Sequence, residues 1–343
     1  MKNQKSKITL VVDWNPSAEG FWLKDELEKL GFEVKLIGLI GFTFKDRTIK
    51  WRKILLWIKY LLTGLKTIKL TKKGEIIISW NFIIGSYIAF VAKLLHIDRK
   101  ILSLNLIAHQ KGFFNELLRN IVYKQAFVND NFYATVNSQK LIDKYNESFK
   151  SKSHKYFVLN DPYDPESEIA DFQQNKSFVF AGGEAARDWN LLFEVAQRLP
   201  EISFKIIVRR KYFNIEKKLP NVSIEFDTSL QYFYQKMKES SLVVISLNSD
   251  APSGILVLHR AALLSKPIIA TETSITKTYI TNNENGILIP MHDVNSLKNG
   301  IKNLFNNQDL SKEFATNLNN RILNEYSPQH YTHKLVEILN KIK

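Results

Sequence analysis

The sequence predicts an α/β protein built from two doubly wound, Rossmann-like halves, and three observations predict this class. Short apolar runs alternate with longer segments of helical periodicity, which indicates parallel sheets covered by helices. The alternation stops in a polar segment at 161–177, which contains two prolines, and then starts again. The chain has 343 residues, a length that suits about two domains.

The first half begins with a strand, a polar loop and a helix that Gly31 ends. The strands expected in this half cover residues 7–13, 32–41, 75–79, 100–106 and 132–138, with a short one at the start of HKYFVLNDPYDPE. The helices expected there cover residues 21–30, 84–95, 113–124 and 139–145.

The second half repeats the pattern. Its expected strands cover residues 177–181, 203–208, 222–226, 241–247 and 266–271, with a short apolar run at 287–290. Its expected helices cover residues 189–198, 230–239, 255–264, 294–306, 310–323 and 328–342. We therefore expect an N-terminal domain at 1–165, a second domain at 166–326 and a C-terminal helix at 327–343. Ligands of such sheets bind beyond the carboxyl ends of the strands, so the natural site is the cleft that these ends border.

Composition limits the classes of function. The chain contains no cysteine, which excludes disulfides and thiolate metal sites and fits an intracellular location. The N-terminus is expected to be a first strand and not a signal peptide. The apolar segment at 54–65 is too short to span a bilayer, and the one at 76–95 contains Asn81, Gly85 and Lys93. We expect that second segment to be a strand, a turn and a helix.

The net charge of +14 is concentrated in one segment. Residues 45–73 contain ten Lys and Arg residues and the single acid Asp46. The apolar residues there, from Trp51 to Leu65, recur at helical spacing, as in a helix that lies in an anionic membrane interface. The alternative is a helix that packs its apolar stripe on the sheet and leaves its lysines in solvent.

Two loops have the composition of phosphate-binding loops. In FVFAGGEAARDW a strand ends at Gly182 and Gly183, and Arg187 precedes the next helix. Ser253 and Gly254 stand where a second loop opens a helix. Free N–H groups and the dipole at a helix N-terminus attract anions, and arginine suits bidentate phosphate binding. Each loop has a plainer interpretation, in which the glycines only make a tight turn and Arg187 is solvated.

The segment at 243–290 resembles the donor-binding region of GT-B glycosyltransferases, in particular the retaining, nucleotide-sugar-dependent family 4. SKPIIAT and NNENGILIP are similar to that family's motifs, and YSPQHYTHKLVEIL is similar to its C-terminal helix, which crosses back to the first domain. Both glutamates of the family's donor motif are replaced, by Pro252 and Arg260. The family's arginine near the second-domain glycines is also absent, and Arg187 falls where a phosphate-binding lysine is expected.

The resemblance implies a set of site residues. His109 corresponds by position to a histidine that lies near the transferring sugar, although a lone histidine is more often structural. Asp13, Glu19 and Gly20 are expected to border the cleft on the acceptor side, or to cap the helix that follows. The expected donor-binding residues are Gly182, Gly183, Arg187, Arg209, Ser253, Gly254, Ile255, Leu256 and Arg260.

The resulting expectation is a glycosyltransferase that retains anomeric configuration and needs no metal or other cofactor. Its expected partners are a nucleoside-diphosphate sugar, a lipid-linked glycan acceptor in bacterial surface polysaccharide assembly, and an anionic membrane surface through 45–73. We expect it to be cytoplasmic and peripheral on the inner face of the cell membrane. A catalytically silent GT-B subunit is the first alternative. A nucleic-acid-binding protein is the second, and it is disfavoured because no known binding module occurs in the sequence.

Overall fold

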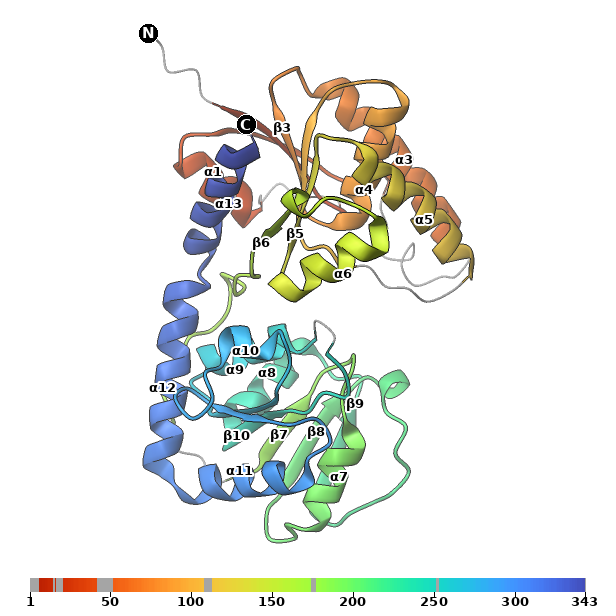
Figure 1. The fold of residues 1–343 in the computed structure, drawn as a ribbon. Helices are drawn as coiled ribbons and strands as arrows, with labels where there is room; N and C mark the ends of the chain where they lie inside the picture. Colours follow the sequence, from red (N-terminus) through yellow and green to blue (C-terminus); the bar gives the residue numbers. More distant parts are fainter. Residues whose placement is uncertain are drawn as a thin grey trace. The chain divides into compact units, whose positions relative to one another are not determined.

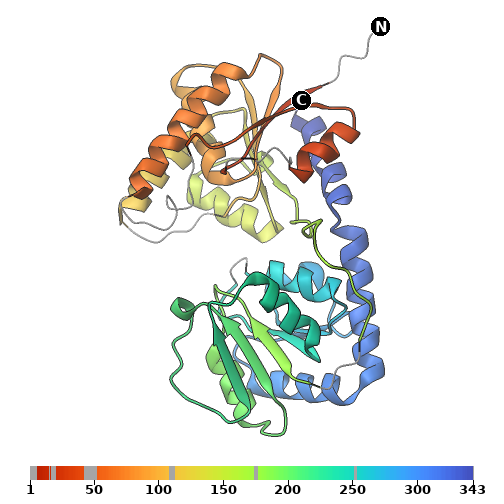
Figure 2. The ribbon, with the colours of Figure 1, turned by 180° about the vertical axis from the view of Figure 1, so that it is seen from behind.

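The computed structural model of the chain describes residues 6–14, 16, 21–41, 52–107, 113–173, 177–250 and 253–342. The chain divides into two units (Figures 1 and 2). Unit 1 comprises Met1–Asp161 and Pro328–Lys343, and unit 2 comprises Pro162–Ser327. Each unit has one six-stranded sheet whose paired strands are all parallel, so the predicted fold class is confirmed.

The sheet of unit 1 has the strand order β2-β1-β3-β4-β5-β6. Its strands are β1 (Lys7–Val11), β2 (Glu33–Ile37), β3 (Ile76–Ser79), β4 (Lys100–Ser103), β5 (Phe132–Val136) and β6 (Tyr156–Val158). Its helices are α1 (Trp22–Lys29), α3 (Arg52–Leu70), α4 (Phe82–Leu94), α5 (Phe113–Val128), α6 (Gln139–Phe149) and α13 (Pro328–Ile342).

Two layers of helices cover the sheet of unit 1. The helices α1 and α13 share a core with β1, β3 and β4, in which Leu27 and Leu335 are fully buried. The C-terminal helix therefore belongs to the first unit, as the sequence predicts. The helices α3, α4, α5 and α6 contact one another in sequence and cover the other face, as right-handed crossovers require (Figure 1).

The sheet of unit 2 has the order β12-β11-β10-β7-β8-β9, which is the doubly wound dinucleotide-binding arrangement. Its strands are β7 (Val179–Gly182), β8 (Phe204–Val208), β9 (Val222–Phe226), β10 (Leu242–Ile245), β11 (Ile268–Thr271) and β12 (Ile287–Ile289). Its helices are α7 (Trp189–Gln197), α8 (Leu230–Glu239), α9 (Ile255–Leu263), α10 (Thr276–Tyr279), α11 (Val294–Asn306) and α12 (Gln308–Glu325).

The central strands β3, β7, β10 and β11 are buried along their whole length, because helices cover both faces of each sheet. The helix α4 is similarly apolar, and nine of its residues are buried. Its position explains the long hydrophobic stretch at 76–95, which is β3 followed by α4. Within the described ranges, no helix combines the length and the apolar character needed to cross a membrane.

Candidate functional site

The strand order of unit 2 reverses between β7 and β10, which are hydrogen-bonded neighbours. Because β7 and β10 run in the same direction, the loops that follow them leave the sheet at the same edge. From there the two loops lead to helices on opposite faces of the sheet. The loop after β7 leads through Arg187 to α7, and the loop after β10 leads through Ser253 and Gly254 to α9. This topological switch point is where open α/β sheets bind ligands, so it brings the two predicted loops to one site.

Arg187 is the central cation of this site. Its side chain is 8% exposed, and its Nε donates a hydrogen bond to the Gly182 carbonyl at 2.9 Å. Its Nη1 donates to the Ala185 carbonyl at 3.0 Å and to Ser253 Oγ at 3.1 Å. Burial lowers the pKa of Arg187 to about 10, so the guanidinium is still charged at neutral pH.

Within the described part of the chain, Arg187 has no carboxylate partner, and its Nη2 donates no hydrogen bond. A buried charge without a counterion is costly unless hydrogen bonds and an opposite charge compensate it. The three neutral acceptors fix the position of the guanidinium and leave it able to bind an anion.

Both loops require glycine, either because the backbone has a positive φ or because a Cβ would collide with neighbouring atoms. A Cβ on Gly183, whose φ is 116°, would lie 2.8 Å from Cζ of Arg187. A Cβ on Gly182 would lie 2.5 Å from the ring of Phe233. Gly254 has a φ of 89°, and a Cβ there would lie 2.9 Å from Cγ2 of Ile245. The glycines thus make space for the Arg187 guanidinium and for the tight entry into α9.

The N-terminus of α9 differs from most helix N-termini of unit 2. Side chains of Asp188, Ser229, Asp293 and Asn307 cap α7, α8, α11 and α12, whereas Gly254 provides no side-chain cap for α9. Helix N-termini leave backbone N–H groups without intrahelical partners. The first turn of α9, beside the Arg187 guanidinium, therefore has backbone donors and a positive dipole end available to an anion.

The other predicted donor-site residues have different surroundings. Arg209 is exposed and forms an ion pair with Glu184 at 2.7 Å, which ties the β8 loop to the β7 loop. The Arg260 guanidinium stacks on the ring of Tyr234 at 3.9 Å and lies 3.9 Å from the Asp164 carboxylate. At the start of α9, Ile255 is buried and the Leu256 side chain is 75% exposed. The donor-binding roles of these residues stay predictions.

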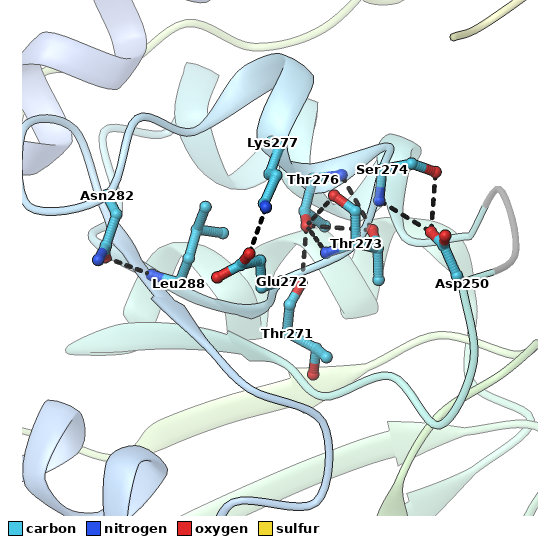
Figure 3. Close-up of polar contacts among 9 residues, drawn as sticks. All are labelled: Asp250, Thr271, Glu272, Thr273, Ser274, Thr276, Lys277, Asn282 and Leu288. Atoms are coloured by element: carbon cyan, nitrogen blue, oxygen red, sulfur yellow. Dashed lines mark hydrogen bonds and ion pairs between the residues drawn. The ribbon is translucent and has the colours of Figure 1, made fainter. Parts of the chain in front are cut away.

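The loop after β10 is also fixed to the loop after β11 (Figure 3). Asp250 Oδ1 accepts hydrogen bonds from both the N–H and the Oγ of Ser274, each at 2.8 Å. Thr276 Oγ1 donates to the Thr271 carbonyl at 2.7 Å and accepts a hydrogen bond from the Thr273 N–H at 2.8 Å, which fixes the turn before α10. The sequence analysis did not single out Asp250, because its partner is 24 residues away in the chain.

In unit 1 the corresponding switch point lies between β1 and β3. Asp13 follows β1 there, two residues beyond its end. The predicted residues Glu19, Gly20 and His109 lie outside the described residues, so their roles stay predictions.

The basic segment contains the helix α3, which begins at Arg52. Its buried face consists of small and polar residues together with Tyr60 and Ile68. Gly64 lies against α4, where a Cβ would be 3.2 Å from Cγ2 of Val91. The exposed apolar residues of α3 are Leu70 at its end and six that from here on form the α3 apolar face: Ile54, Leu55, Ile58, Leu61, Leu62 and Leu65. The alternative in which α3 packs this apolar stripe on the sheet is therefore wrong.

The sequence analysis missed a second polar group next to Arg187. Asp188 is buried, caps α7 through the Leu191 N–H at 3.0 Å, and is 2.5 Å from Nδ1 of His292. A carboxylate directly before a helical pattern is an N-cap signal, but no local pattern predicts the partner 104 residues away. Among the described residues, no group of three His, Cys, Asp or Glu side chains has metal-binding geometry.

Comparison with known proteins is consistent with this geometry. Residues 214–321 match the family model described as Glycosyl transferases group 1. The chain is 27% identical over 107 residues to a poly(ribitol-phosphate) alpha-N-acetylglucosaminyltransferase of Staphylococcus aureus (strain COL). That alignment covers 31% of this chain and only 22% of the relative.

Solved structures resemble the whole chain. Anabaena HepE in complex with UDP and glucose is 13% identical, with a TM-score of 0.66 over 98% of this chain and 100% of that one. Sucrose-phosphate synthase from Thermosynechococcus elongatus is 13% identical, with a TM-score of 0.71 over 98% of this chain and 99% of that one. At these identities the likeness establishes the fold. The chain thus has the two-domain GT-B fold of glycosyltransferases, and its residues 214–321 match the model of the glycosyl transferases group 1 family.

Proposed function

We propose that the protein is a glycosyltransferase that moves a sugar from a nucleoside diphosphate to a glycan acceptor. The observation that carries this proposal is the buried Arg187 guanidinium, which has no carboxylate partner in the described structure and lies beside the uncapped start of α9. A diphosphate would supply the missing negative charge and accept hydrogen bonds from Nη2 and the α9 amides. The group 1 match and the UDP bound to HepE support a nucleotide donor.

In this proposal the residues of unit 2 stabilise the leaving group. Negative charge grows on the diphosphate as the bond to the sugar breaks, and Arg187 and the α9 N-terminus are already positioned to neutralise it. The sugar would keep its anomeric configuration, and transfer would need no metal. Activity that survives excess EDTA would support the last point, and restoration by added Mg²⁺ or Mn²⁺ would contradict it.

Thermal stability in the presence of nucleotides tests the proposal. A ligand that binds only the folded protein raises its melting temperature, so one of UDP, GDP, ADP and CDP should stabilise the chain. Arg187→Ala should remove this rise, whereas Arg198→Ala, at an exposed arginine that follows α7 and is paired with Glu194, should keep it. The release of free nucleotide from matching nucleotide sugars then identifies the donor. The proposal fails if no nucleotide stabilises the wild-type chain.

We further propose that the acceptor is a lipid-linked glycan of a bacterial surface polysaccharide, such as capsule, exopolysaccharide or lipopolysaccharide. The Staphylococcus aureus relative is named for transfer to poly(ribitol-phosphate), a related type of acceptor. In this proposal the enzyme is cytoplasmic and peripheral on the inner face of the membrane. The α3 apolar face supports this arrangement, because the exposed Lys66 and Lys69 on the same helix can meet anionic headgroups while Ile and Leu side chains enter the interface.

Cosedimentation with vesicles tests the membrane contact. The chain should bind phosphatidylglycerol vesicles, and the double variant Ile58→Asp, Leu62→Asp should not. Both side chains are exposed, so neither change disturbs the core. Leu230→Asp, at an exposed leucine of unit 2, is the matched control and should bind like the wild type. Equal binding by the double variant would exclude the α3 apolar face as the contact.

A catalytically silent GT-B subunit is the second candidate. In the sequence, Pro252 and Arg260 stand where the family has the two donor-motif glutamates. The Arg260 guanidinium stacks on Tyr234 and lies near the Asp164 carboxylate. A silent subunit would still be stabilised by a nucleotide but would neither hydrolyse nor transfer any nucleotide sugar. The two assays together therefore separate the candidates.

A further inference from the structure

A pocket of about 390 Å³ lies beside the N-terminus of α7 in unit 2. The first turn of α7, the start of α11 and the loops after β7, β8, β10 and β12 form its walls. Its volume is at the lower end of the range usual for small-molecule sites, about 300–1,000 Å³. Its polar lining includes Arg187, Asp188, Asn190, Asn214, Asn248 and His292.

Asp188 and His292 form a fixed pair in this pocket. The backbone of Asp188 is bonded on both sides to Ser246, and its Oδ1 caps α7, so only Oδ2 is left for His292. The carboxylate can only accept, so Nδ1 of His292 carries the hydrogen of the 2.5 Å contact. His292 has a φ of 60°, an uncommon left-handed conformation for a non-glycine residue, and its side chain is 65% exposed. The pair therefore holds an imidazole with Nε2 available at the pocket.

The other polar groups are neutral amides. Asn190, Asn214 and Asn248 are exposed around the pocket, and amides both donate and accept hydrogen bonds, although one Asn248 donor is bonded to the Arg187 carbonyl at 3.4 Å. Asn248 is positioned by its N–H bond to the Ala186 carbonyl at 3.0 Å. Trp189 forms part of the wall and is fixed by a bond from Nε1 to the Tyr212 carbonyl at 3.0 Å.

This combination selects a class of ligand. Arg187 lines the pocket too, but its guanidinium is held by Gly182, Ala185 and Ser253, and an anion in the pocket would also meet the carboxylates of Asp188 and Glu194. A metal ion would need a third ligand, and the described residues contain no such group. An apolar molecule would leave the amides and the imidazole without partners. Hydroxyl groups both donate and accept, so they match amides and imidazole together.

We propose that this pocket binds a neutral polyhydroxyl ligand, a sugar unit, with the Asp188–His292 pair as its main hydrogen-bonding group. The pocket adjoins the proposed diphosphate position, because Arg187 is one of its lining residues and Asn248 Nδ2 donates to the Arg187 carbonyl at 3.4 Å. The Arg187 side chain is bonded to Gly182, Ala185 and Ser253, whereas the Asp188–His292 pair has its own contacts, so sugar binding at the pair can be tested apart from nucleotide binding. The sugar can come from the acceptor or from an independent glycan, and both present the same hydroxyl chemistry.

Saturation-transfer NMR on the complete chain tests the inference, with glucose, galactose and N-acetylglucosamine as probes. At least one sugar should bind the wild-type protein, with and without saturating UDP. His292→Asn and Asn214→Ala should each weaken binding about tenfold or more. Asparagine tolerates the left-handed backbone, so the first variant should fold, and an unchanged melting temperature checks this. Asn306→Ala, at the other end of α11, is the matched control and should bind like the wild type.

Three outcomes would overturn the inference. No probe sugar binds the wild-type chain, or both pocket variants bind as tightly as the control, or UDP displaces the sugar and so places it in the Arg187 loops. A loss of sugar binding with intact nucleotide stabilisation separates this site from the proposed donor site. If the variants also raise the KM for a glycan acceptor, the sugar comes from the acceptor, and if they leave it unchanged, the sugar comes from an independent glycan.

Discussion

Nη1 of Arg187 lies 3.1 Å from Oγ of Ser253, although 66 residues separate them in the chain. Ser253 Oγ in turn donates to the Ala185 carbonyl at 2.7 Å, two residues before Arg187. The β7 and β10 loops are thus joined at the point where the sheet order reverses. This junction predicts that the two side chains act together on an anion.

A double-mutant cycle measures this coupling. Arg187→Lys should weaken UDP binding about tenfold, because lysine keeps the charge but loses the planar hydrogen-bonding geometry. Ser253→Ala should have a smaller effect. Calorimetric affinities of the single and double variants should give a coupling energy of about 0.5–1.5 kcal/mol. Additive effects would mean that Ser253 does not position the guanidinium.

Gly183→Ala should destabilise the chain more than Gly31→Ala. Both glycines have positive φ values, 116° and 88°, so both variants pay for backbone strain. At Gly31 a Cβ has no neighbour within 4 Å, whereas at Gly183 it collides with the Arg187 guanidinium. Urea denaturation compares their stabilities. Nucleotide stabilisation should disappear only in Gly183→Ala, and equal behaviour of the two variants would refute the close packing of this loop.

His259 should make the stability of the chain sensitive to acid. Its ring is buried against those of Tyr279 and Tyr326, and burial lowers the pKa of His259 to about 4. Between pH 6.5 and 4 the unfolded chain binds the proton more readily, so stability falls as the pH falls through this window. The loss should reach about 3 kcal/mol near pH 4. His259→Phe should lose less stability over the same range, as melting temperatures at each pH would reveal, and parallel curves would contradict the assignment.

Lys266 should produce the same trend at alkaline pH, where stability again rises as the pH rises. It is buried and donates to the Ser240 carbonyl at 2.9 Å, and burial lowers the pKa of Lys266 to about 8. Above pH 8 the folded chain releases this proton before the unfolded chain does, so the linked stability rises toward pH 10.5. The gain from pH 8 to pH 10 is about 2 kcal/mol. The Lys266→Met variant lacks this contribution. Urea denaturation of the wild type and the variant at pH 8 and pH 10 gives the free energy of unfolding of each, and the wild type should gain more between the two pH values.

Much of the fold follows from local patterns. Alternating strand and helix signals predicted two parallel sheets, and the helix expected at 328–342 is the observed α13. The glycines at 182, 183 and 254 marked the two loops that meet at the switch point, because positive φ and close packing require glycine there. The signals for helices, strands and turns come from residues that are close together in the chain, so they can be recognised from the sequence alone.

The orientation of α3 illustrates what the sequence left open. Its amphipathic pattern predicted a helix but permitted the apolar stripe to face either the sheet or the solvent. Close packing of Gly64 against α4 turns the small residues inward and leaves Ile58 and Leu62 outside. Only the shape of the neighbouring helix decides between these two orientations.

The sequence by itself determined the class of the fold, the glycine loops that meet at the switch point of unit 2 and the resemblance to GT-B glycosyltransferases. The tertiary structure alone decided that Arg187 lacks a carboxylate partner among the described residues, that Ser253 reaches it, and that Asp188 pairs with His292. These contacts join residues 66 and 104 positions apart. Strand order and helix packing bring them together, and no local pattern in the chain encodes those distances.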